Sequence, residues 1–210
     1  MPLISPNSVI LFQGDSITDC DRDIDTLGDG YAAMTAGALD ALYPDYQLKL
    51  FNRGISGNRV RDLRDRWQED CLDLAPDIVT ILVGINDTWH WFTGGDRVSE
   101  AAFEEDYRYI VEKTRGTGAA LVLLEPFLLP VEDSQEEWRH DLGAKIQIIR
   151  RLAREYQTEY IPLDGLFAKA SAAQPMDSLA FDGVHPTPEG HRLIARVLLE
   201  ALTQNRLTDN

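Results

Sequence analysis

Short apolar runs alternate with helical patterns along almost the whole chain, and this alternation limits the folds that it can adopt. Buried strands are predicted at residues 9–12, 47–51, 77–83, 119–124 and 160–163. Helices are predicted at residues 31–43, 59–72, 99–115, 135–156, 166–173 and 187–203. Strands that alternate with helices predict βαβ units, and hence a parallel sheet covered by helices on both faces.

Four stretches lack a regular pattern and are expected to be loops: residues 19–30, 88–98, 127–134 and 174–183. Three of them directly follow predicted strands. Open α/β sheets place their sites beyond the carboxyl ends of the strands, so these loops are where a site is expected. A length of 210 residues without a convincing linker predicts one domain, residues 1–210.

The charge balance excludes several classes of partner. The chain has 35 acidic and 20 basic residues, a net charge of −15, which disfavours binding to nucleic acid and to anionic membrane surfaces. A neutral small-molecule substrate is easier to reconcile with this charge. The first residues lack the basic start and apolar run of a signal peptide, and no stretch approaches the ~18 apolar residues of a membrane span. A cytoplasmic location is therefore expected.

The two cysteines, Cys20 and Cys71, form no C-x-x-C pair and no zinc spacing. They are interpreted as reduced thiols, and a disulfide between them stays open. Alternating acidic residues between Asp19 and Asp25 suggest a calcium loop, but Ile24 occupies the position where the EF-hand requires glycine. The interpretation is a solvated acidic loop, so no metal and no cofactor are expected.

Ser16 follows the first predicted strand, within the segment Gly14-Asp15-Ser16-Ile17. A serine hydroxyl becomes a useful nucleophile when a base lies within hydrogen-bond reach and a third group orients that base. Gly14 permits a tight turn that would expose the serine. The alternative is a serine that only caps the next helix, since the segment is not the G-x-S-x-G elbow of the α/β-hydrolases.

A base is available in the segment Asp182-Gly183-Val184-His185 near the other end of the chain. An aspartate three residues before a histidine, on an irregular segment, can fold back and fix the tautomer of the imidazole. The alternative is a surface turn before a helix start. His90, His140 and His191 lack a comparable setting.

Two further residues follow predicted strands and can stabilise a developing oxyanion. Asn86, directly after the third strand, offers a side-chain amide, and Gly57, after the second strand, offers a backbone N–H. Each has a simpler interpretation as a turn residue.

These segments occur in a fixed order that resembles the four sequence blocks of the SGNH hydrolases, also called the GDSL esterase family. The resemblance covers about residues 9–200. It implies a three-layer α/β/α sandwich with a five-stranded parallel sheet, a flavodoxin-like arrangement. It also implies a triad of Ser16, Asp182 and His185, an acyl-Ser16 intermediate, and an oxyanion hole formed by Ser16, Gly57 and Asn86.

A closer resemblance, to a branch of intracellular acetylxylan esterases, rests on residues 14–20, 30–31, 52–62, 66–67 and 81–89. It implies hydrolysis of short-chain esters, namely acetyl esters of carbohydrates such as acetylated oligosaccharides. Phe181 stands where that branch is expected to have tryptophan, which affects acyl and sugar preference. The alternatives are a lysophospholipase, a thioesterase or a broad short-chain carboxylesterase, and, more remotely, a non-catalytic sugar-binding module.

Asp15, Trp89 and Phe181 are the expected substrate contacts. Trp89 belongs to an aromatic segment, residues 88–95, that can stack on a sugar ring or shape a small acyl pocket. The same aromatic residues could instead form a buried cluster or a contact between subunits of a homo-oligomer. Arg59, which follows the Gly57 block, is expected either to order that loop or to contact substrate.

Overall fold

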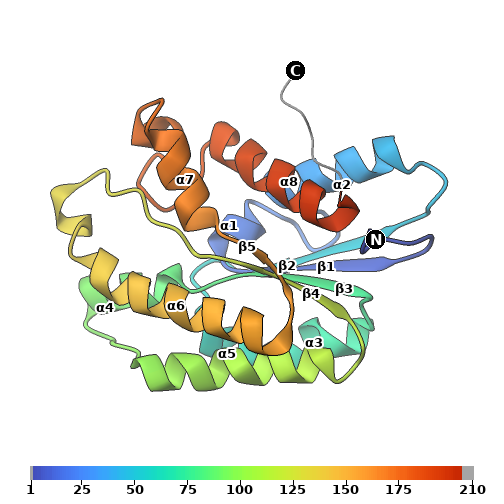
Figure 1. Cartoon of the computed structure of the whole chain (residues 1–210), viewed down its shortest axis with the longest axis horizontal. Coiled ribbons are helices and arrows are strands. Elements are labelled where there is room, and N and C mark those ends of the chain that lie inside the picture. Colours follow the sequence, from blue (N-terminus) through green and yellow to red (C-terminus); the bar gives the residue numbers. More distant parts are fainter. Residues whose placement is uncertain (1, 205–210) are drawn as a thin grey trace.

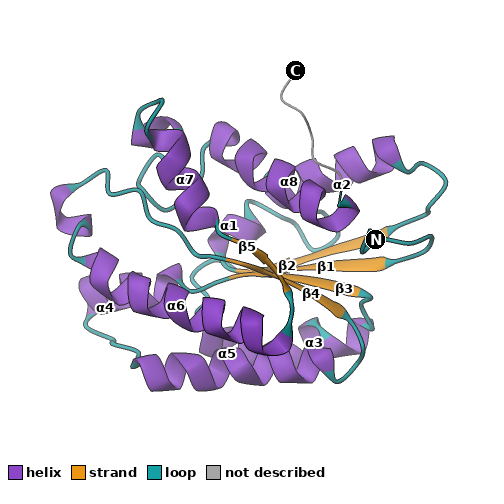
Figure 2. Cartoon of the chain, in the orientation of Figure 1, coloured by secondary structure: helices purple, strands orange, loops and turns teal. Residues whose placement is uncertain are grey.

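The computed structural model describes residues 2–204 and contains a five-stranded, fully parallel sheet. Figure 1 shows helices packed on both faces of this sheet, and Figure 2 shows the strands as the central layer. The strands are β1 (Val9–Gly14), β2 (Lys49–Gly54), β3 (Ile78–Leu82), β4 (Ala120–Leu124) and β5 (Glu159–Ile161). The predicted three-layer α/β/α sandwich is therefore confirmed.

Two groups of helices cover the two faces. Helices α2 (Tyr31–Leu42), α7 (Leu163–Ser171) and α8 (Pro188–Thr203) lie on one face. Helices α3 (Val60–Asp70), α5 (Glu100–Arg115) and α6 (Trp138–Tyr156) lie on the other. The remaining helices are α1 (Ser16–Asp19), α4 (Ile85–Gly94) and the short 3₁₀ turns η1 (Leu72–Leu74), η2 (Asp133–Gln135) and η3 (Met176–Ser178).

Successive residues of the central strands supply the two cores alternately. In β1, Ile10 and Phe12 are buried against the α2–α8 layer, whereas Leu11 is buried against the α3–α5–α6 layer. Side chains of a strand point to opposite faces with a period of two, so a strand covered on both faces is apolar throughout. This explains why the strands appear in the sequence as continuous apolar runs.

The strand order β2-β1-β3-β4-β5 places a topological switch between β1 and β3. The chain leaves β1 toward β2 on one side and then returns to β3 on the other side. Ligand sites of open α/β sheets lie at such a switch, outside the carboxyl ends of the strands. Ser16 follows β1 and Asn86 follows β3, so both flank this position.

The expectation of an irregular segment at residues 88–98 was wrong for residues 88–94, because α4 occupies Ile85–Gly94, whereas residues 95–98 are irregular as expected. Ile85 is fully buried, and Trp89 and Phe92 pack against the same core, so apolar residues at helical spacing form one face. Gly95, with φ +75°, ends the helix by donating its N–H to the carbonyls of His90 and Trp91. Trp89 and Phe92 thus lie on the core-facing side of an amphipathic helix.

The strand predictions differ from the structure at their ends, and the differences are largest in β1, β2 and β5; β1 runs to Gly14 and not to residue 12. β2 runs to Gly54 and not to residue 51, because the polar residues Asn52 and Arg53 continue the pairing with β1. β5 stops at Ile161, before Pro162, which has no N–H for a sheet, and Leu163 begins α7. The helix predicted at residues 135–156 begins at Trp138, after a separate 3₁₀ turn that contains Gln135.

Cys20 and Cys71 are free thiols, the first half-buried and the second buried, as expected. Within residues 2–204, no helix combines the length and the apolar composition required to cross a membrane.

Candidate active site

The turn between β1 and α1 presents Ser16 at the switch point of the sheet. A side chain at Gly14 would collide with the Thr18 hydroxyl and the Leu82 carbonyl, so glycine is required there. Asp15 then caps α1, its Oδ1 accepting a hydrogen bond from the N–H of Ile17 at 3.1 Å. Ser16 becomes the first residue of α1, where its own N–H has no partner within the helix.

Ser16, His185 and Asp182 form a continuous series of hydrogen bonds. Ser16 Oγ lies 2.9 Å from His185 Nε2, and His185 Nδ1 lies 2.6 Å from Asp182 Oδ2. The other carboxylate oxygen of Asp182 accepts the backbone N–H groups of Val184 and His185, at 3.0 and 2.7 Å. The structure therefore brings together the three residues that the sequence suggested, in the order required for proton transfer.

The charges of the site follow from these contacts. Burial opposes ionisation of Asp182, but hydrogen bonds from the His185 side chain and from two backbone N–H groups outweigh it and lower its pKa. The hydrogen bond that His185 Nδ1–H donates to Asp182 raises the pKa of His185 above its ordinary value, against the effect of burial. His185 is therefore a stronger base than a free histidine, and Asp182 stays ionised beside it.

The loop that carries Asp182 is fixed by a residue that the sequence did not single out. Gln135 donates from Nε2 to the Asp182 carbonyl at 2.7 Å and accepts the N–H groups of Val131 and Glu132 at its Oε1. Nearby, Gly183 adopts φ +84°, and a side chain there would collide with the Leu129 carbonyl and with Gln135. No spacing pattern in the sequence links residue 135 to residue 182.

Two residues that can donate hydrogen bonds, Gly57 and Asn86, line one cavity together with Ser16. Asn86 donates from Nδ2 to the Asn58 carbonyl at 3.1 Å, which orients the amide and leaves its second N–H for another acceptor. Gly57 has φ +83°, and no hydrogen bond within residues 2–204 uses its N–H. Together with the Ser16 N–H, these groups can hold an oxyanion.

Ser16 lies between two cavities, and both include Ser56 and His185 in their walls. The cavity of about 400 Å³, called here the donor cavity, is completed by Gly57, Asn86, Trp89, His90 and Thr93. The cavity of about 310 Å³, called here the loop cavity, is completed by Ile17, Cys20, Asp21, Phe181, Pro186 and His191.

The three expected substrate contacts have different surroundings. Trp89 lines the donor cavity and packs its ring on Trp138, with centroids 5.6 Å apart. Phe181 lines the loop cavity, is 63% exposed and stacks on the His185 ring at 5.9 Å. Asp15 is 1% exposed and lines neither cavity, so its side chain supports α1 and is not placed to touch a ligand.

His191, which the sequence did not single out, forms part of the loop cavity. Its Nδ1 accepts the N–H of Tyr31 at 3.1 Å, and its Nε2 lies 3.4 Å from Cys20 Sγ. Burial lowers the pKa of His191 to about 4, so the ring is neutral near pH 7. Its position one turn into α8 gives no hint of this role in the sequence.

Arg59 orders the start of α3. This agrees with the structural role, which was one of the two roles expected for it. It forms ion pairs with Asp62 and Asp96, and its backbone N–H donates to Asp62. It lines neither cavity beside Ser16.

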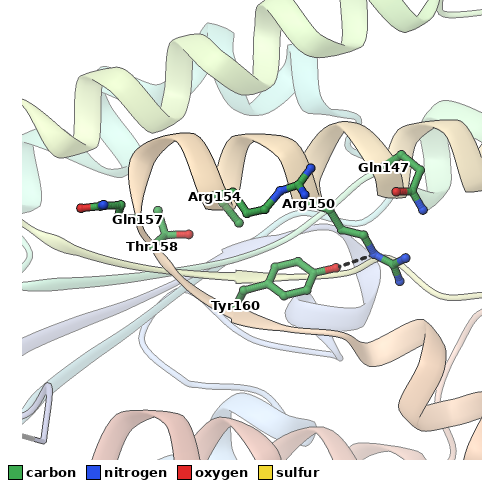
Figure 3. Close-up of a pocket in the computed structure, with 7 residues that line it drawn as sticks. Gln147, Arg150, Arg154, Gln157, Thr158 and Tyr160 are labelled. Atoms are coloured by element: carbon green, nitrogen blue, oxygen red, sulfur yellow. Dashed lines mark hydrogen bonds between the residues drawn. The ribbon is translucent and has the colours of Figure 1, made fainter.

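A further cavity, of about 450 Å³, shares no lining residue with the two cavities beside Ser16. It lies between the C-terminal half of α6 and β5, and Figure 3 shows Arg150 reaching the Tyr160 hydroxyl in it. Arg150 and Tyr160 are both bonded to the buried Glu125. The residues that line this cavity include no serine, cysteine or histidine, so they do not form a site comparable to that at Ser16.

A serine, a histidine and an aspartate in hydrogen-bonded series thus lie at the switch point of a parallel α/β sheet. The sequence also matches the GDSL-like lipase/acylhydrolase family over residues 12–193. The chain belongs to this family and is an esterase.

Individual relatives cover nearly the whole chain. An acetylxylan esterase from Geobacillus stearothermophilus is 33% identical over 95% of both chains. The crystal structure of Axe2, an acetylxylan esterase from the same organism, is 32% identical with a TM-score of 0.89, over 99% of each chain. A structure described as a GDSL-like lipase, from Parabacteroides merdae, is 36% identical with a TM-score of 0.90, over 95% of this chain and 97% of that one. Catalytic mutants of Axe2 carry alanine in place of a serine, an aspartate or a histidine.

Proposed function

We propose that the protein removes acetyl groups from carbohydrate esters, with Ser16, His185 and Asp182 as its catalytic triad. The observation that carries the proposal is the 2.9 Å approach of Ser16 Oγ to His185 Nε2, with Asp182 on the far side of the ring. The acetylxylan esterase relatives, which match over almost the full chain, support an acetylated carbohydrate as the substrate.

The chemistry proceeds in two acyl transfers. Ser16 Oγ attacks the ester carbonyl while His185 Nε2 takes its proton, and the carbonyl oxygen becomes an oxyanion. The N–H groups of Ser16 and Gly57 and the Asn86 amide stabilise this charge, each donor contributing about 10²–10³-fold in rate. His185 then gives the proton to the leaving alcohol, and the acetyl group remains on Ser16.

Deacylation repeats these steps with water. His185 removes a proton from a water molecule, whose oxygen attacks the acetyl carbonyl, and the returned proton releases Ser16 and acetate. Asp182 holds Nδ1–H of His185 throughout, which keeps Nε2 available as base and stabilises the imidazolium that forms.

The test is hydrolysis of an aryl acetate by the wild type and by Ser16→Ala. The variant should lose nearly all activity, whereas Ser134→Ala, at an exposed serine on η2, should retain it. Undiminished hydrolysis by Ser16→Ala would show that the triad assignment is wrong. Aryl esters of increasing acyl length test the acetyl preference, and activity that rises beyond butyrate would favour a lipase or thioesterase. Acetate release from acetylated xylo-oligosaccharides tests the carbohydrate substrate directly.

A further inference from the structure

The loop cavity has a different chemical character from the donor cavity, although both lie against Ser16 and His185. The donor cavity contains Gly57 and Asn86, and Trp89 forms an apolar wall. The loop cavity contains none of the oxyanion donors beyond Ser16 itself, and it contains instead an acidic residue, Asp21, and an exposed aromatic ring, Phe181.

The positions of the donors assign the parts of an ester to the two cavities. The carbonyl carbon carries both the acetyl methyl and the leaving oxygen, so each of the two cavities beside Ser16 can hold one of them. An oxyanion between Gly57 and Asn86 lies in the donor cavity, where Trp89 forms an apolar wall that suits the methyl. His185 lines both cavities and its ring contacts Trp89 as well as Phe181, so Nε2 can give its proton to a leaving oxygen on the side of the loop cavity.

We propose that the loop cavity is the alcohol subsite and that Asp21, Phe181 and His191 make it selective for uncharged, hydroxyl-rich alcohols over anionic ones. The proposal rests on the proposed esterase function and deepens it. It distinguishes a sugar ester from a lysophospholipid or a coenzyme A thioester, whose leaving groups carry phosphate.

Phe181 supplies the apolar part of this recognition. Its side chain is 63% exposed, and the ring lies at 16° to the His185 ring. The ring contacts the base and still exposes most of its surface, on which the C–H face of a sugar ring can pack. Burial of this exposed apolar surface under a ligand is favourable.

Asp21 supplies hydroxyl acceptors and a negative charge. It is exposed, has a backbone φ of +59°, and forms no ion pair within residues 2–204. Burial first, and then the charges of Asp21, Asp29 and Asp19, raise the pKa of the neighbouring Cys20 thiol. The one cation on this loop, Arg22, is bonded to Asp19 and to the Gly54 carbonyl. The electrostatic field at this wall therefore repels anions.

His191 contributes a hydrogen-bond donor without a positive charge. Because Nδ1 accepts the Tyr31 N–H, the proton of the neutral ring resides on Nε2. Its present acceptor, Cys20 Sγ at 3.4 Å, is a weak one, so a hydroxyl oxygen in the cavity can compete for this proton. A cationic histidine here would attract anionic leaving groups, whereas this one does not.

A pair of aryl acetates tests the charge selectivity. Methyl 4-acetoxybenzoate and 4-acetoxybenzoate release leaving groups of similar shape, and only the second is anionic. The wild type should favour the neutral ester in kcat/KM by about tenfold or more at low salt, and added salt should reduce this preference. Asp21→Lys should remove or invert the preference.

Asp40→Lys is the matched control, because Asp40 is exposed on α2, lines neither cavity and gives the same change in net charge. It should keep the wild-type ratio. If Asp21→Lys does not fold, Asp21→Asn should still reduce the preference and its salt dependence. A ratio that is unchanged in the Asp21 variants overturns the alcohol subsite. Failure of the wild type to hydrolyse either ester would contradict the proposed function instead.

Discussion

Gln135 donates a hydrogen bond from Nε2 to the backbone carbonyl of Asp182 at 2.7 Å, across 47 positions of sequence. Gln135 is itself held by two backbone N–H groups of the preceding loop, so the contact connects η2 to the loop that carries Asp182 and His185. The contact holds Asp182 through its backbone carbonyl. Both oxygens of its carboxylate therefore remain available to accept hydrogen bonds from His185 and from backbone N–H groups.

Replacing Gln135 by leucine should therefore lower kcat more than it changes KM, since the ester would still bind while Asp182 and His185 lose their alignment. A displacement of about 1 Å at a catalytic group can cost about 10²-fold in rate. Steady-state kinetics on an aryl acetate measure the two parameters separately. Gln147→Leu, at an exposed position on α6, serves as the control. Unchanged kcat in a folded Gln135→Leu would exclude a positioning role.

The pH dependence of activity should report His185. The hydrogen bond that His185 donates to Asp182 raises the pKa of His185 above its ordinary value of 6.5, and only the neutral ring can act as base. A profile of kcat/KM should therefore rise with pH through a limb whose midpoint lies above 6.5. Asp182→Asn removes the charge, so the limb should move to lower pH, and kcat should fall on the order of 10⁴-fold. Asp177→Asn, at an exposed site, should leave the limb in place.

Asp15 should make the stability of the fold depend on pH. Burial raises its pKa to about 7, so the folded chain retains a proton that the unfolded chain releases above about pH 4. The unfolding free energy should therefore decrease as pH rises from about 4 to 7, by on the order of 4 kcal/mol from this group. Asp15→Asn cannot ionise and should lack this decrease.

Urea unfolding of the wild type and of Asp15→Asn at pH 4.5 and pH 8 measures the difference in unfolding free energy between the two proteins. Asp87, whose pKa burial also raises to about 7, is common to both proteins, so its contribution cancels. Asp40→Asn, at an exposed position, should follow the wild type at both values. A difference between wild type and Asp15→Asn that does not change with pH would contradict this role for Asp15.

The sequence predicted the layers and the place of the site because both follow from local patterns. Apolar runs identify strands that are covered on both faces, and in a parallel sheet every strand end lies at one edge. Ser16, Gly57 and Asn86 could therefore be placed near one another before the structure was known. The β2 boundary was missed because polar residues at its end pair with β1 through their backbone, which side-chain hydrophobicity does not report.

Contacts between segments that are far apart in the sequence were not predictable in this way. Gln135 reaches Asp182, and His191 reaches Cys20, only after the chain has folded, and neither pair has a characteristic spacing. α4 was predictable in principle, since Ile85, Trp89 and Phe92 have helical spacing and Gly95 ends the helix. Its aromatic composition instead suggested a binding segment.

Gly183, in the loop that carries Asp182 and His185, should not tolerate a side chain. Its φ of +84° is unfavourable for any residue with a side chain, and a methyl group would collide with the Leu129 carbonyl. Gly183→Ala should therefore lose about 1–3 kcal/mol in unfolding free energy and should also lower kcat, because the strain acts on the neighbouring Asp182. Gly143→Ala is the matched control: it lies within α6 with open space for a methyl group, so it should gain up to about 1 kcal/mol. Urea unfolding and aryl acetate kinetics on both variants measure the contrast, and equal behaviour of the two would mean that the loop adapts without moving Asp182.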